Sequence, residues 1–181
     1  MPALAFLKRL AGRAEHYNPF NLLVFDGTQL AGLQSHGAQI VAMQPGIGAV
    51  SNADFHSPWP KLTWLRGALE THVNRNRTSR ETDDGLDVEA LLSILKNDAT
   101  APDDALPQTG LPLLRERVLS AAFITSPDYG TRACSVVKIA RTKAEFVERS
   151  FDVCGELGTQ HHSFSLIPGA TIPGDGHDRT R

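Results

Sequence analysis

The chain has 181 residues, of which 41% are hydrophobic and 21% are charged, and its formal net charge is −2 at pH 7. These values are ordinary for one globular domain and give no basis for general nucleic-acid affinity. No apolar run approaches the ~20 residues of a membrane-spanning helix, and no secretory signal is recognisable. Cys134 and Cys154 are too few for a disulfide framework, so we expect a cytoplasmic protein without a membrane span.

The first fifty residues predict one helix followed by an antiparallel meander. Ala3–His16 carries leucine and alanine at helical spacing, and Asn18-Pro19 ends this pattern. Asp26-Gly27 is a strong signal for a hairpin turn. The expected strands are Phe20–Phe25, Gln29–Gln34, Gln39–Met43 and a short one at Ala49–Asn52.

The middle of the chain predicts two helices separated by polar loops. Lys61–Asn74 has leucines on one face, and Asp87 is placed to cap a second helix at Val88–Lys96. Asn74–Gly85 is basic and then acidic, which favours a solvated loop. Asn97–Pro112 is rich in Asp, Pro, Thr and Gly and is also expected to be a loop.

The sheet is expected to resume near residue 119. Three strands are predicted, at Leu119–Thr125, Thr131–Ala140 and Glu145–Val153, with a turn at Ser126–Gly130 between the first two. The strand pattern fades after Gly155. We therefore expect one domain over residues 1–155 and a flexible tail over residues 156–181, most clearly in Pro168–Arg181.

Strands, then helices, then strands predict an α+β domain in which antiparallel sheets pack against helices. The runs Phe20–Phe25 and Val136–Ile139 read as buried on both faces. That burial needs more layers than this chain supplies, so we expect either a homo-oligomer or a partner segment outside the sequence. The chain alone is expected to be of marginal stability.

Four positions are candidate ligand-binding residues from the sequence itself. Asn52 ends a predicted strand and is placed to donate to an oxyanion, or to cap a turn instead. Thr131 and Arg132 come directly after the turn that ends at Gly130. Arg132 either binds the carboxylate of a ligand or forms an ion pair with Asp128 or Glu148. Trp59, held between two prolines, either walls a ligand pocket or closes the edge of the core.

Metal chemistry finds little support in the sequence. Cys154, His161 and His162 lie on a stretch without a second ligand cluster, so no metal site is predicted. No nucleophile elbow is present either. The residues alone thus predict a domain with a polar pocket and leave the reaction open.

Several segments, in order, resemble the NRDE family of the transport and Golgi organisation protein 2 type. The first three are Tyr17–Val24, Val50-Ser51-Asn52 and Ser57-Pro58-Trp59-Pro60-Lys61. The others are Leu106–Gly110, Tyr129-Gly130-Thr131-Arg132 with Ser135-Val136-Val137, and Phe146–Phe151. The resemblance covers about Ala3–Asp152.

This family is similar to the N-terminal-nucleophile hydrolases, which implies an αββα fold and a nucleophilic cysteine exposed after removal of the initiator Met. Here position 2 is Pro2, and the Asn-Arg-Asp-Glu motif of the family is absent. The chain thus resembles the C-terminal portion of the family domain and lacks the nucleophile. By analogy with bile-salt hydrolases, the resemblance implies Asn52 as an oxyanion donor and Arg132 as a pocket arginine, with Trp59, Tyr129 and Thr131 beside them.

Two functions follow from the resemblance. The first is a non-catalytic or truncated family member that binds a small molecule, with a role in haem trafficking or Golgi organisation. The second is an amidase or acyltransferase whose nucleophile-bearing segment is missing from this chain; a degraded gene product is a third reading. No cofactor is expected except haem by resemblance, and no His or Cys stands in a clear axial-ligand context.

Overall fold

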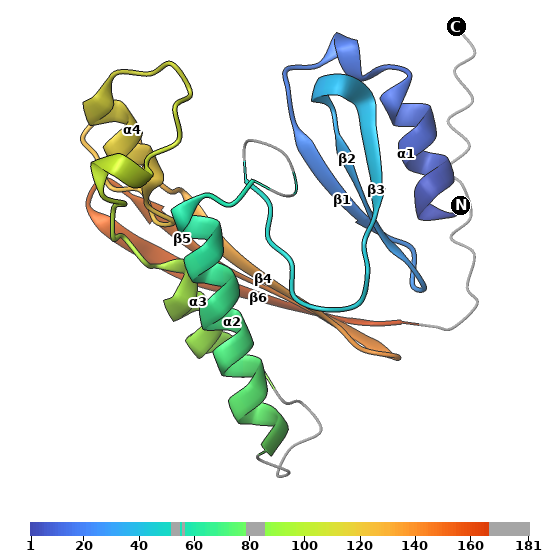
Figure 1. The fold of residues 1–181 in the computed structure, drawn as a ribbon. Helices are drawn as coiled ribbons and strands as arrows, with labels where there is room; N and C mark the ends of the chain where they lie inside the picture. Colours follow the sequence, from blue (N-terminus) through green and yellow to red (C-terminus); the bar gives the residue numbers. More distant parts are fainter. Residues whose placement is uncertain (52–54, 56, 79–85, 167–181) are drawn as a thin grey trace, which may run out of the picture.

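The computed structural model describes residues 1–51, 55, 57–78 and 86–166. It is an α+β protein with two antiparallel sheets, ordered β1-β2-β3 and β4-β5-β6 (Figure 1). The predicted fold class is confirmed, and the arrangement is consistent with an N-terminal-nucleophile-hydrolase-like fold. None of the helices described is long and apolar enough to cross a bilayer.

The first unit is helix α1 (Ala3–Ala11), which packs on the sheet of β1 (Asn21–Phe25), β2 (Leu30–Gln34) and β3 (Gln39–Ala42). The apolar stripe of the helix covers one sheet face, as its spacing predicts. Leu7, Ala31 and Leu33 are fully buried there. The Asp26-Gly27 hairpin is confirmed, with Gly27 at φ 94°, a conformation that glycine adopts without strain.

The second unit contains helices α2 (Pro60–Thr78) and α3 (Val88–Leu95) and the sheet of β4 (Ala133–Ile139), β5 (Lys143–Asp152) and β6 (Gly155–Ser165). Helix α3 packs on β4, and α2 packs on α3 (Figure 1). The core is Leu92 against Cys134, Val136, Val147 and Phe151. The predicted strand at Thr131–Ala140 is confirmed over Ala133–Ile139, and its even-numbered positions face this core.

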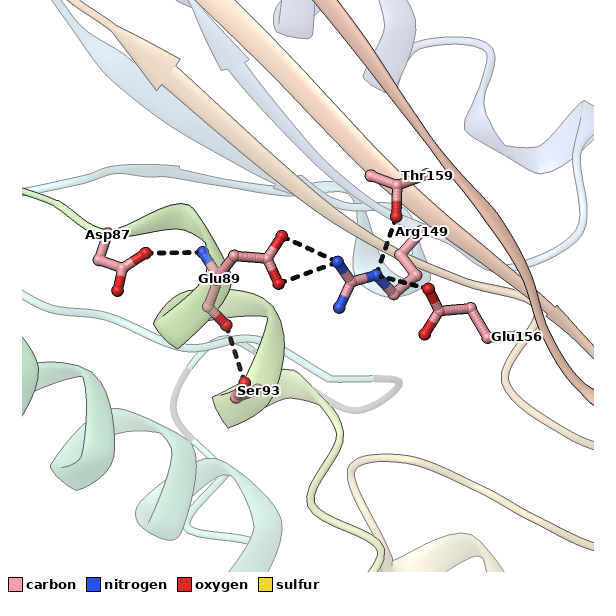
Figure 2. A network of polar contacts seen from close by, with 6 residues as sticks. All are labelled: Asp87, Glu89, Ser93, Arg149, Glu156 and Thr159. Carbon is pink, nitrogen blue, oxygen red and sulfur yellow. Dashed lines mark hydrogen bonds and ion pairs between the residues drawn. The ribbon is translucent and has the colours of Figure 1, made fainter.

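A polar network joins α3 to the sheet (Figure 2). Asp87 caps the helix by accepting from the Glu89 N–H at 2.9 Å, as the sequence predicts. The Glu89 carboxylate then receives two hydrogen bonds from Arg149 on β5, at 2.8 and 2.9 Å. Arg149 also donates to Thr159 at 2.9 Å and lies 3.3 Å from Glu156.

The predicted strand Leu119–Thr125 is wrong. Helix α4 (Leu113–Ser120) covers its first residues, and residues 121–125 form no strand. Pro112 is an effective helix start, because its carbonyl accepts from the N–H groups of Arg115 and Glu116. Glu116 and Ser120, four residues apart, are both buried, so helical periodicity outweighs the strand propensity of this segment.

Strand β6 occupies residues that the sequence assigned to the tail. It pairs with β5 from Gly155 to Ser165, with one irregularity at Ser150/Phe151. All of its residues are exposed, so it carries no alternating apolar pattern for a sequence-based prediction to detect. The predicted tail Pro168–Arg181 lies outside the described residues.

Three other features differ from the expectation. Helix α2 continues to Thr78, so the first part of the predicted loop Asn74–Gly85 is helical; residues 79–85 lie outside the described residues. Residues 49–51 form no strand. The two runs expected to be buried on both faces are buried on one face only, since Phe25 is 43% and Val137 is 59% exposed.

Candidate functional site

A pocket of about 570 Å³ lies between segments that are far apart in the sequence. Its walls come from the start of α2, the loop before α4, helix α4 itself, and the turn that precedes β4. Trp59 and Tyr129, two of the predicted site residues, both line it.

The start of α2 fixes Trp59 at the pocket. Its N–H donates to the Ser57 carbonyl at 2.9 Å, and its own carbonyl accepts from Leu62 and Thr63 at 2.9 and 3.0 Å. Pro60 is therefore the first residue of the helix, where its missing N–H costs nothing. Trp59 is half-buried, belongs to neither buried cluster and lines this pocket.

Lys61 follows on the first turn of α2 and also lines the pocket. Its Nζ donates to the Leu119 carbonyl at 2.8 Å and lies 5.7 Å from the centre of the Trp59 ring. Burial lowers the pKa of the Lys61 amine, because the charged form is poorly solvated there.

Glu116 also lines the pocket and is buried, with only 6% of the residue exposed. It accepts from the Thr109 N–H at 2.8 Å and from the Thr109 hydroxyl at 2.5 Å. The hydroxyl bond is the main cause that lowers the pKa of Glu116, and backbone bonds from Thr109 and Leu111 add to it. Glu116 thereby holds the loop before α4 in place and is itself satisfied.

Arg115, on helix α4, also lines the 570 Å³ pocket. Its guanidinium lies 5.1 Å from the centre of the Tyr129 ring and 3.2 Å from the Asp128 carboxylate. A hydrogen bond from Ser126 and the charge of Arg115 both lower the pKa of Asp128. Stacking on Tyr129 fixes the cation at the rim of the pocket.

A second pocket, of about 530 Å³, adjoins the first and shares Ile124 and Tyr129 with it. Thr131 and Arg132 line this pocket. Thr131 is fixed by a reciprocal pair, since its N–H donates to the Ile124 carbonyl at 2.9 Å and its hydroxyl accepts from the Ile124 N–H at 2.8 Å.

The side chain of Arg132 is exposed and faces this second pocket. Of its predicted ion-pair partners, Asp128 pairs with Arg115, and Glu148 accepts from Ser135 at 2.7 Å. Within the described residues, Arg132 therefore forms neither of the two predicted ion pairs.

The structure thus gathers four of the five predicted residues around two adjoining pockets: Trp59, Tyr129, Thr131 and Arg132. Asn52 lies outside the described residues. Lys61, Arg115 and Glu116 were missed. Lys61 adjoins Trp59 in a segment quoted for the resemblance, which is the one signal that could have identified it.

Neither of two other features contributes to this site. A pocket of about 760 Å³ lies between α2, α3 and β4, but its walls are mainly aliphatic and include none of the predicted residues. In the part of the chain that the structure describes, no three His, Cys, Asp or Glu side chains converge as a metal site would require. His161 and His162 are adjacent on β6 and so point to opposite faces.

Comparison with known proteins gives one family match. The family model described as Transport and Golgi organisation 2 matches residues 1–153, which confirms the resemblance drawn from the sequence. The Transport and Golgi organization protein 2 homolog of Bos taurus is 34% identical over 161 residues, covering 83% of this chain and 57% of the relative. The Homo sapiens homolog is 29% identical over 160 residues, covering 82% and 56%.

The Mus musculus Transport and Golgi organization 2 homolog is 28% identical over 162 residues, covering 83% of this chain and 57% of the relative. The chain therefore spans a little over half the length of these curated relatives. Three of the segments that carry the family resemblance, around Trp59, Thr109 and Tyr129, meet at the 570 Å³ pocket.

Proposed function

Because the chain belongs to the Transport and Golgi organisation 2 family, we propose that it is a small-molecule-binding member of that family whose ligand is an amphipathic organic anion. The ligand lies in the pocket between the start of α2 and helix α4. The observation that carries this proposal is the meeting of three sequence-distant family segments on one pocket.

The chemistry of the walls supports this ligand class. Trp59, Tyr129 and Leu119 offer aromatic and aliphatic surface, and Lys61 and Arg115 offer positive charge. The carboxylate of Glu116 is already satisfied by Thr109, so it does not neutralise the cations by direct contact. Pockets of this kind bind the apolar body of a ligand by burial and orient it through a few charged groups.

The wider role remains that of the family names, transport and Golgi organisation, here as the carriage of such a ligand in the cytoplasm. Cys134 and Cys154 are both free thiols, which supports a reducing compartment. Fractionation of cells that express the natural protein tests the location. Recovery of the protein mainly in a membrane-enclosed secretory compartment would contradict it.

Haem is one anion of this class, and the resemblance suggests it. Its propionates suit Lys61 and Arg115, but among the described residues that line the two adjoining pockets there is no histidine. The donors there are Tyr129, which carries Arg115 on its ring, the exposed thiol of Cys154, and the amines of Lys61 and Lys96. The pocket therefore suits the organic anion and offers the iron no clear axial ligand.

Fluorescence titration tests the proposal. Trp59 and Trp64 are the two tryptophans, so a Trp64→Phe background leaves Trp59 as the reporter. We expect saturable quenching by protoporphyrin IX and by anilinonaphthalene sulfonate, with haemin no tighter than the metal-free porphyrin. Arg115→Met should weaken binding roughly tenfold, the effect of losing about 1.4 kcal/mol.

The matched control is Arg141→Met, in the turn between β4 and β5 and away from the pocket. Equal affinities in the Arg115 and Arg141 variants would contradict the site. Much tighter binding of haemin than of the metal-free porphyrin would show iron ligation and contradict the ligand class.

A second candidate is an amidase or acyltransferase of the N-terminal-nucleophile type. Its support is the α+β arrangement of antiparallel sheets and helices, which is a fold-level analogy. The sequence has Pro2 where that chemistry needs a cysteine, so the nucleophile would have to come from a segment that this sequence does not carry. The mass and N-terminal sequence of the protein from its natural source, with an amide-hydrolysis assay, test this candidate.

A further inference from the structure

Lys61 differs in its surroundings from Lys96, a second lysine that lies beside an aromatic ring. Its amine is half-buried in the pocket and contacts one backbone carbonyl, that of Leu119, at 2.8 Å. No carboxylate within the described residues forms an ion pair with it, because Glu116, on the same pocket, is engaged by Thr109. The amine therefore faces the pocket without a counter-ion.

Lys96 provides the comparison within the same molecule. Its amine lies 5.5 Å from the centre of the Phe151 ring, nearly the 5.7 Å that separates Lys61 from Trp59. Lys96 is exposed, however, so water solvates its charge. Each lysine lies beside an aromatic ring and on the wall of a pocket, since Lys96 lines the 530 Å³ pocket, so the two differ mainly in the burial of the amine.

We propose that Lys61 is a nucleophilic amine that condenses with an aldehyde or ketone held in this pocket. The inference rests on the proposed function only in using the same pocket. It assigns to the site a covalent chemistry that binding alone does not require.

Two features of the surroundings favour the neutral, nucleophilic form of the amine. Burial lowers the pKa of Lys61. Lys61 lies in the first turn of the 19-residue helix α2, where the helix dipole opposes a positive charge. Arg115 on α4 also lines the pocket, but its charge is paired with that of Asp128 at 3.2 Å. Of the other titratable groups there, Glu116 opposes these effects but is bound to Thr109, and Tyr129 lies under Arg115.

The reaction balances without an oxidant or a metal. The Lys61 nitrogen forms a bond to the carbonyl carbon, and the carbonyl oxygen takes up a proton to give a carbinolamine. Loss of that oxygen as water, with the remaining amine proton, gives a neutral imine. The imine nitrogen takes up a proton from water, and hydride from added cyanoborohydride then adds to the carbon to give a stable secondary amine.

Reductive trapping tests the proposal on the full chain. The probe is 4-carboxybenzaldehyde with cyanoborohydride, followed by peptide mapping of the modified lysines. At pH 7 we expect Lys61 to be modified roughly tenfold faster than Lys96, because a larger fraction of its amine is neutral. The modification of Lys61 should also reach half its maximal rate at a lower pH than that of Lys96.

Lys61→Arg should abolish the fast modification, and Lys8→Arg, on the exposed side of α1, should leave it unchanged. Equal rates and equal pH profiles at Lys61 and Lys96 in the unmodified sequence would overturn the proposal, whatever the variants do. If Lys61 is unreactive while anilinonaphthalene sulfonate still binds, the reactive amine is wrong and the proposed binding function stands. If Lys61 is trapped selectively but no anion binds, the opposite holds.

Discussion

The Oδ2 atom of Asp26 accepts a hydrogen bond from the backbone N–H of Ala3 at 2.8 Å. The other carboxylate oxygen of Asp26 accepts from Thr28 and Gln29, so one side chain holds both the β1–β2 turn and the start of α1. Pro2 gives the helix no side-chain cap, and the carboxylate of a distant turn takes that role. These backbone hydrogen bonds hold the pKa of Asp26 well below its usual range.

Asp26→Asn should therefore destabilise the protein in a pH-dependent way. The pKa of Asp26 is lower in the folded state than in the unfolded state, where it is about 3.9. The stabilisation is fully present above that value and is lost as the pH falls below it. Thermal unfolding should show a clear difference between the two proteins at pH 7 and a smaller one at pH 3. Asp98→Asn is the matched control, and an equal effect at both pH values would contradict the prediction.

Two glycine substitutions should have opposite signs. A Cβ atom on Gly32 would lie 2.5 Å from Phe55 Cζ and 2.8 Å from Met43 Cε, so Gly32→Ala should cost roughly 1–3 kcal/mol through overpacking. Gly67 lies within α2 with open space around it, so Gly67→Ala should stabilise by roughly 0.5–1 kcal/mol. Urea unfolding measures both, and a shared sign would refute the packing argument.

The cap of α3 should be worth about 1 kcal/mol, a typical value for an N-cap carboxylate. Asp87→Ala removes the acceptor for the Glu89 N–H and frees the residue that pairs with Arg149 (Figure 2). The free energy of unfolding should fall by that amount. Asp104→Ala, in the exposed turn of residues 103–105, should change it by less than about 0.5 kcal/mol.

Glu116 should control the order of the loop before α4. Glu116→Ala removes the acceptor of both Thr109 bonds, so residues 97–112 should become more susceptible to limited proteolysis. The pKa of Glu116 is lowered on folding, so the same loosening should develop in the unmodified protein as the pH falls below about 4.3. Glu15→Ala, exposed in the segment after α1, is the control. An unchanged cleavage rate in the Glu116 variant would show that other contacts hold the loop.

Elements whose buried face is apolar were largely predictable from the sequence, whereas α4, whose buried residues are Glu116 and Ser120, was not. The hairpin at Asp26-Gly27, the cap at Asp87 and most of the strand at Thr131–Ala140 are all confirmed, because each depends on neighbours a few residues away. Strand β6 was not predictable in this way. Its residues are exposed on both faces, and it exists through its hydrogen bonds to β5.

The residues that line the pocket show the same contrast between features set by local sequence and features set by tertiary contacts. Trp59 and Tyr129 were found from their turn context and from the family resemblance. Glu116 and Arg115 were missed because residues 113–118 were assigned to no element, and only the helix places Glu116 beside Thr109 and Arg115 on Tyr129. A buried charge depends on tertiary contacts, which no local pattern carries.

The two hydrophobic clusters, one under α1 and one under α3, share no residue. None of the described residues that line the 570 Å³ pocket belongs to α1, β1, β2 or β3. A sub-global opening that exposes the amides of α1 to hydrogen exchange can thus occur while the pocket walls stay closed. Ligand should then slow exchange around α2 and α4 and leave α1 unaffected. The unit of α1, β1, β2 and β3 can in this sense unfold locally while the 570 Å³ pocket keeps its shape.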